Sequence, residues 1–207
     1  LAALAFLVLG LLCVLADGLW SGHWPLLRRL HLHLNLLGFV GITAIGTLQV
    51  LLPTAGGYSD PAVVQRLRRG LWYVVAGTLL VAAGSLWSPW ITWGGLALWL
   101  VPLCQTVLVA LRHWPQTNHG AGISLLGALA GYCFVLISGA LHAVGALAPR
   151  SGIALYFVVF LLPLVTGAVS HLLPLWLAPQ AGSAGHERGR RVLQAGSRVR
   201  TLVFLSC

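Results

Sequence analysis

The chain alternates between long apolar runs and short segments rich in Gly, Pro, Ser and Arg. Each apolar run is close to the roughly 20 residues that cross the core of a bilayer as a helix. Because lipid offers no hydrogen bonds to the backbone, such runs are expected to be helical. We therefore predict an all-α, polytopic membrane helical bundle of about six transmembrane helices, at residues 1–20, 31–53, 70–87, 91–111, 121–147 and 154–178.

The pattern changes after the last apolar run. From Gln180 the sequence reads "QAGSAGHERGRRVLQAGSRVR", which is rich in Gly, Ser and Arg. Such a composition buries little apolar surface, which is typical of disordered segments. We expect one transmembrane domain over residues 1–179 and a basic, mobile cytoplasmic tail over residues 180–207.

Composition supports an integral membrane protein whose main partner is the lipid bilayer. The chain is 58% hydrophobic and 7% charged, whereas soluble domains carry about 25% charged residues. Its net charge is +9, and the basic residues, all Arg, lie in the loops and tail, where charge sets membrane orientation. The sequence has no basic soluble module of the kind that holds nucleic acid, so we expect no nucleic-acid partner. A prokaryotic cytoplasmic membrane is the expected location.

The distribution of Arg predicts the orientation, because cytoplasmic segments carry the excess of basic residues. With the N-terminus in the cytoplasm, the inside segments hold Arg66, Arg68, Arg69, Arg112, Arg188, Arg190, Arg191, Arg198 and Arg200. The outside loops hold only Arg28, Arg29 and Arg150. We therefore expect both termini on the cytoplasmic side (N-in/C-in).

Histidine is the residue type that carries candidate chemistry. Only three carboxylates are present, Asp17, Asp60 and Glu187. The sequence shows no Ser-His-Asp set, no paired-carboxylate site and no Gly-rich phosphate loop, so we expect neither hydrolysis nor phosphoryl transfer. Four histidines fall in loops or the tail and are expected to be solvated or interfacial: His23, His113, His119 and His186.

Four other histidines, His31, His33, His142 and His171, fall within predicted spans. An ionisable group at membrane depth is a functional candidate because burying it unpaired is costly, and neutral imidazole is a good ligand for iron and copper. By position, His31, His33 and His142 share the outer half of the membrane. His171 lies in the inner half, and we interpret it as a structural residue more readily than as a ligand.

The spacing of His31 and His33 constrains what they can bind. Residues i and i+2 point roughly 200° apart on an α-helix, so a straight helix cannot direct both imidazoles at one metal. One of them could face His142 while the other faces a second site or the headgroups, and the choice stays open. Small residues around His142, in "SGALHAVGA", leave room for a flat macrocycle. The same residues would also allow close packing of helices.

The second and sixth spans end in similar octamers, "GTLQVLLP" at residues 46–53 and "GAVSHLLP" at residues 167–174. This similarity is consistent with a duplicated unit. It is also consistent with the frequent use of Gly and Pro in membrane helices.

The stretch "HLHLNLLGFVGITAIGTLQVLLPTAGG", residues 31–57, resembles the tenth helix of the catalytic subunit of haem–copper oxidases. It also looks like short, oxidase-subunit-I-like bacterial and archaeal membrane proteins. The shared features are the HxH motif, three glycines, a proline and the Gly-Gly that follows: Gly38, Gly41, Gly46, Pro53, Gly56 and Gly57. By this resemblance, His31 corresponds to a high-spin haem ligand, His33 corresponds to a low-spin haem ligand, and His171 is not a haem ligand.

The chain departs from that family in ways that limit the resemblance. The family has roughly twelve helices in this subunit and builds a copper site from His-x-x-x-Tyr and an adjacent His-His pair. This sequence contains no His-His dipeptide and no His followed by Tyr four residues later. We therefore do not expect this chain to reduce oxygen by itself.

Three hypotheses for function remain. The leading one is a haem-binding membrane subunit with one or two haem b groups held by His31, His33 and His142. It would transfer electrons, with quinol as a candidate donor and other membrane or periplasmic redox subunits as partners. The second is a copper-handling membrane protein that also uses Cys104 and Cys133. The third is a packing or assembly subunit without catalysis. Outside these three, a transporter stays open, because Pro102 and Pro163 within spans permit broken helices.

Overall fold

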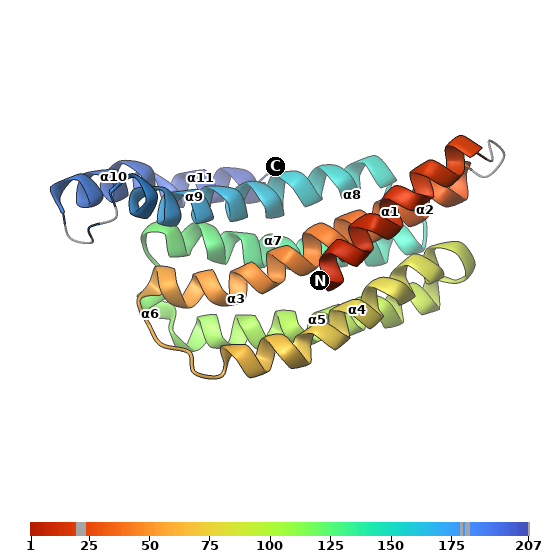
Figure 1. Cartoon of the computed structure of the whole chain (residues 1–207), viewed down its shortest axis with the longest axis horizontal. Helices are drawn as coiled ribbons and strands as arrows, with labels where there is room; N and C mark the ends of the chain where they lie inside the picture. Colours follow the sequence, from red (N-terminus) through yellow and green to blue (C-terminus); the bar gives the residue numbers. More distant parts are fainter. Residues whose placement is uncertain (20–23, 179, 181–182, 207) are drawn as a thin grey trace. The chain divides into compact units, whose positions relative to one another are not determined.

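A computed structural model gives the fold and describes residues 1–19, 24–178, 180 and 183–206. These residues fold into helices and form no strand among them (Figure 1). Within the described ranges, six helical segments are long and apolar enough to cross a membrane. The predicted class, an all-helical membrane protein with six spans, is confirmed. His23 lies outside the described residues.

The six spans follow one another along the chain. The first is α1 (Ala2–Leu19), and the second comprises α2 (Trp24–His33), η1 (Leu34–Gly41) and α3 (Ile42–Gly56). The third and fourth are α4 (Val63–Trp87) and α5 (Pro89–Arg112). After the short α6 (Trp114–Thr117), the fifth is α7 (Gly120–Ala143), and the sixth comprises α8 (Pro149–Leu155), η2 (Tyr156–Leu161) and α9 (Leu162–Leu177).

Three spans begin at least five residues earlier than the sequence predicted, and each of these extensions carries arginine. The second span begins at Trp24 rather than residue 31, the third at Val63 rather than residue 70, and the sixth at Pro149 rather than residue 154. Arginine favours the helical conformation, and its long side chain reaches from a helix end to the headgroups. A group of arginines therefore need not end a membrane helix.

The second and sixth spans share a structural feature beyond their similar octamers. Each contains a π-helical segment, η1 in the second span and η2 in the sixth. In each span the π-helical segment precedes the octamer, at Gly46 and at Gly167 respectively. π-Helical turns inside α-helices occur frequently at functional sites, and η1 begins directly after His33.

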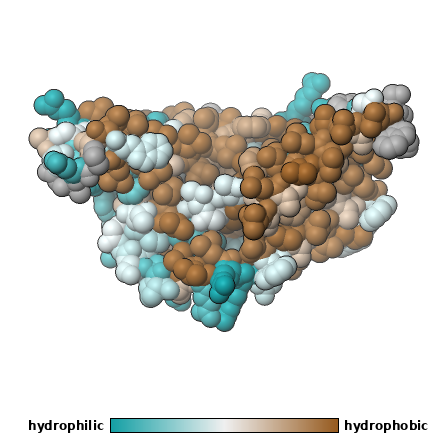
Figure 2. Space-filling model, in the orientation of Figure 1, coloured by the Kyte–Doolittle hydropathy of each residue, from teal (hydrophilic) through white to brown (hydrophobic). Residues whose placement is uncertain are grey.

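The chain divides into two compact units. The first unit holds residues Leu1–Thr47, Ala62–Gln105 and Gly139–Leu147. In it, α1 packs along α2 and η1, which also contact α4. Figure 1 shows α1 and α2 side by side, and Figure 2 shows apolar residues over most of their visible surface.

The second unit holds residues Leu48–Pro61, Thr106–Ser138 and Ala148–Cys207. Its centre is the contact between α7 and the sixth span, where the rings of Tyr132 and Phe160 lie 4.5 Å apart between centroids. Gly131 of α7 meets the backbone carbonyl of Val159 so closely that a Cβ would overlap it. A glycine here allows the close helix approach that is typical of membrane proteins.

We expected residues 180–207 to be mobile; among the described residues of this segment, the structure has two helices that pack on the sixth span. Helix α10 (Ala184–Gln194) lies against α9, and α11 (Ser197–Ser206) contacts η2 and α9. The hydroxyl oxygens of Ser124 in α7 and Thr201 in α11 lie 3.3 Å apart, and both side chains are buried. Tertiary contacts with the sixth span and α7 therefore stabilise a segment whose composition alone suggests disorder.

Candidate functional site

The first histidine of the HxH segment is held between α1 and α2. Nδ1 of His31 lies 2.9 Å from the carbonyl oxygen of Gly10 in α1, and the carbonyl can only accept, so Nδ1 donates. The amide nitrogen of Asn35 then donates to the backbone oxygen of His31, at 3.0 Å. His31 thus points toward α1 and ties the first span to the second.

This contact depends on small residues. A Cβ on Gly10 would overlap the amide group of Asn35, and a Cβ on Gly38 would lie 2.5 Å from Cγ of Phe6. Phe6 is buried in this contact. The two glycines therefore let α1 approach the second span closely enough to reach His31.

The second histidine of the pair faces another part of the unit. Nδ1 of His33 donates to the backbone oxygen of Arg29, one helical turn earlier, at 2.8 Å. Its imidazole interacts electrostatically with that of His142, which the sequence places more than a hundred residues away. The two side chains of the HxH segment therefore have different partners, as the i, i+2 geometry predicts, and His33 interacts with His142.

His142 lies at the C-terminal end of α7. The helix ends at Ala143 rather than at the predicted residue 147, because Gly145 adopts φ +76°. The N–H of Gly145 donates to the oxygen of His142, and the N–H of Ala146 donates to that of Leu141. These two bonds form a Schellman cap. Nδ1 of His142 then donates to the oxygen of Leu147, at 2.8 Å, just beyond the cap.

His33 and His142 therefore present the same chemistry. In each ring, Nδ1 carries a proton that is donated to a backbone carbonyl, so Nε2 is left with its lone pair. Neither Nε2 atom makes a hydrogen bond to another described residue. An imidazole ligand to a metal has this arrangement, in which the outer hydrogen bond sets the tautomer and the ring orientation.

The remaining histidines have other surroundings. In the second unit, His171 of α9 interacts electrostatically with Arg190 and His186 of α10. The ring of His113 stacks on that of Tyr58, with centroids 4.0 Å apart, and His119 is exposed at the start of α7. His186, expected to be solvated or interfacial, is buried.

Sequence reasoning missed the residues that position the imidazoles. Asn35 lies one turn after His31 and carries a hydrogen-bonding amide, so its i, i+4 spacing was a usable signal. The carbonyls of Gly10 and Leu147 carry no such signal, because any residue supplies a carbonyl.

The donor set suits a paired imidazole site better than a larger metal cluster. Among the described residues, no group of three or more His, Cys, Asp or Glu side chains is placed to hold a metal ion. Cys104 is exposed on α5, and Cys133 of α7 contacts the oxygen of Leu129 in its own helix. Comparisons with known protein families, curated proteins and solved structures give no match to this chain.

Proposed function

We propose that this chain is a haem-binding membrane subunit in which Nε2 of His33 and Nε2 of His142 would hold the iron of a haem b. One observation carries the proposal. Two imidazoles from different spans lie in electrostatic range of one another. Each is fixed through Nδ1 by a backbone carbonyl that leaves Nε2 for the iron.

The protein residues have defined tasks in this proposal. The hydrogen bonds to Arg29 and Leu147 hold the rings in place and increase the basicity of the ligating nitrogens. Because the ligands come from the second and fifth spans, both helices must pack correctly before the pair can form. When bound, the haem supplies one-electron redox chemistry.

His31 has a separate place in the proposal. Its resemblance to a high-spin haem ligand would make it the ligand of a second haem, on the side of the helix that faces α1. The bond from Nδ1 of His31 to Gly10 also leaves its Nε2 without a hydrogen bond to another described residue. The number of haems per chain therefore decides whether His31 is a ligand or only a link between helices.

The cellular setting is part of the same proposal. The chain would lie in a prokaryotic cytoplasmic membrane with both termini inside, as the arginine distribution favours. The His33–His142 pair, at the start of the second span and the end of the fifth, would then lie near the outer surface. Electrons would come from quinol or a neighbouring redox subunit and pass to a partner.

Optical spectroscopy of the purified chain tests the haem proposal. We expect a Soret band and a reduced α-band, and pyridine-haemochrome quantification gives the number of haems. The His33→Asn and His142→Asn variants keep an amide donor near the Nδ1 position but lack Nε2, so each should fold and lose the bands of this haem. His119→Ala, at an exposed histidine, is the matched control and should keep them. A well-folded wild-type chain that takes up no haem would overturn the proposal.

A packing or assembly role is the second candidate, because the same hydrogen bonds also serve structure. His31 links two helices and His142 fastens the segment after a helix cap. If this is their whole role, the two Asn variants should leave the activity of the assembled complex intact. No comparable observation favours the copper-handling alternative.

A further inference from the structure

We propose that helix α10 is an interfacial helix whose exposed arginines, Arg188 and Arg191, bind the phosphate of anionic phospholipid headgroups. This proposal concerns the second unit only and does not depend on haem binding. Three features support it: the depth of α10, its two exposed arginines, and the exposed aliphatic residues of α10 and α11.

The contacts of α10 with α9 set its depth. Helix α10 packs on α9 at Gly189, where a Cβ would lie 3.5 Å from that of Pro174, in ordinary van der Waals contact. The hydroxyl of Ser170 donates to the oxygen of Leu193 at 3.2 Å. Trp176, which follows Pro174 on α9, is 73% exposed. Tryptophan is enriched where a membrane meets water, so α10 lies at the level of the headgroups.

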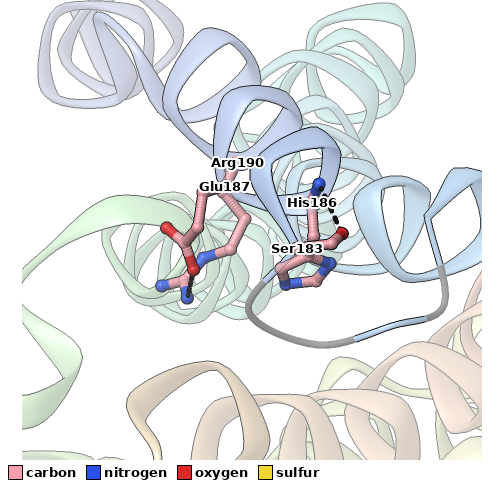
Figure 3. Close-up of polar contacts among 4 residues, drawn as sticks. All are labelled: Ser183, His186, Glu187 and Arg190. Atoms are coloured by element: carbon pink, nitrogen blue, oxygen red, sulfur yellow. Dashed lines mark hydrogen bonds and ion pairs between the residues drawn. The ribbon is translucent and has the colours of Figure 1, made fainter.

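Most charged side chains of α10 and α11 have a hydrogen-bond or ion-pair partner, and Arg188 and Arg191 are the exceptions among the described residues. Arg190 pairs with Glu187 at 3.7 Å, and Ser183 caps the helix by accepting from the N–H of His186 (Figure 3). Further along, Arg198 donates to the oxygen of Asn118 and Arg200 to that of Leu193.

Arg188 and Arg191 are both exposed, and neither has a hydrogen-bond or ion-pair partner among the described residues. Their i, i+3 spacing puts them on one face of α10. These two guanidinium groups are therefore available to a phosphate.

Exposed aliphatic residues on α10 and α11 indicate that the partner is a membrane. Val192 is 68% exposed, and Val199 and Leu202 of α11 are each 66% exposed. Figure 2 shows hydrophilic and apolar residues side by side at the α10 end of the view. Basic residues beside exposed aliphatic ones are typical of helices that lie in the headgroup layer. Aliphatic side chains enter the acyl region while guanidinium groups reach the phosphate, where anionic lipids attract them.

Lipid titration of the full chain by native mass spectrometry tests this proposal. In detergent, we expect phosphatidylglycerol to bind more tightly than phosphatidylcholine. Each arginine near an anionic surface contributes about a fivefold gain in binding. The Arg188→Gln/Arg191→Gln variant should therefore weaken phosphatidylglycerol binding about 25-fold. Glu187→Gln/Arg190→Gln removes the ion pair on the same helix without changing the net charge and should change binding less than about twofold.

Three results would overturn the proposal. They are equal binding of the two lipids, equal weakening by the two double variants, and displacement of phosphatidylglycerol by millimolar inorganic phosphate, which would indicate a site for free anions. The Arg188→Lys/Arg191→Lys variant keeps the charge and should retain the lipid preference. If the Gln variant fails to fold, the wild-type preference must fall steeply in high salt, and a salt-independent preference would contradict the proposal.

Discussion

Nδ1 of His31 donates to the carbonyl oxygen of Gly10, 2.9 Å away, and so joins the first span to the second. The adjacent His33 bonds to the carbonyl oxygen of Arg29 within its own helix and interacts electrostatically with His142. The two imidazoles of the HxH segment therefore make different hydrogen bonds, one to the first span and the other within the second span.

Substitution of Gly10 should weaken the packing of α1 against the second span. In Gly10→Ala, the new Cβ overlaps the amide of Asn35, so the Asn35–His31 contacts must shift. Overpacking of this kind costs about 1–3 kcal/mol of unfolding free energy, which thermal unfolding in detergent would report. Gly18→Ala on the same helix meets nothing within 4 Å and should be nearly neutral. Equal stability of the two variants would contradict the α1 packing described.

Substitution of Gly145, which caps α7 just after His142, should shift the position of His142 without changing either histidine. Gly145 has φ +76°, and a side chain in that conformation costs about 1–2 kcal/mol. We expect Gly145→Ala to lower stability by that amount and to increase hydrogen exchange at Ala146 and Leu147. Gly152→Ala, which meets nothing within 4 Å, provides the comparison and should not reduce stability. Unchanged exchange at Ala146 would show that the cap does not depend on glycine.

The hydroxyl pair of Ser124 and Thr201 should couple α7 to α11. Their oxygens lie 3.3 Å apart and both residues are buried. A double-mutant cycle with Ser124→Ala and Thr201→Val, which keeps the shape of threonine, isolates their interaction. Hydrogen bonds between membrane helices average about 0.6 kcal/mol by this method, and we expect a value near that. Additive single effects would mean that the contact contributes nothing to the docking of α11.

The cap of α10 should control its fraying. Ser183 Oγ accepts from the N–H of His186, at 3.3 Å. Ser183→Ala should cost about 1 kcal/mol of local stability and increase hydrogen exchange in the first turn of α10. Ser183→Asp restores an acceptor that also suits the helix dipole, and it should return exchange to the wild-type level. Fast exchange in both variants would point to a steric effect rather than to the cap.

The number and order of the spans agree with the structure, because the hydropathy of each segment is enough to predict them. Six apolar runs appear as six span-length helices, because hydropathy depends on each segment alone. The helix ends were less predictable. Val63 begins a helix seven residues before the expected start of the third span, and Gly145 ends one before residue 147. Neither π-helical segment carried a recognised sequence signal.

The candidate histidines were identifiable from the sequence, but their partners were not. Ionisable residues within apolar runs are conspicuous, and the i, i+2 spacing already required His31 and His33 to diverge. Which residues each imidazole reaches depends on the rotation of the second span about its own axis, relative to its neighbours. That rotation is set by close contacts such as Gly10 with Asn35 and Gly38 with Phe6.

The sequence by itself determined the membrane class, the number of spans and which histidines lie within apolar segments, since these follow from the composition of single segments. Only the tertiary structure decided that His33 interacts with His142, that His31 bonds to α1, and that the segments 184–194 and 197–206 pack as helices. The physical reason is that helix rotation and the docking of weakly apolar helices depend on contacts between segments far apart in the chain. Hydropathy within one segment does not specify those contacts.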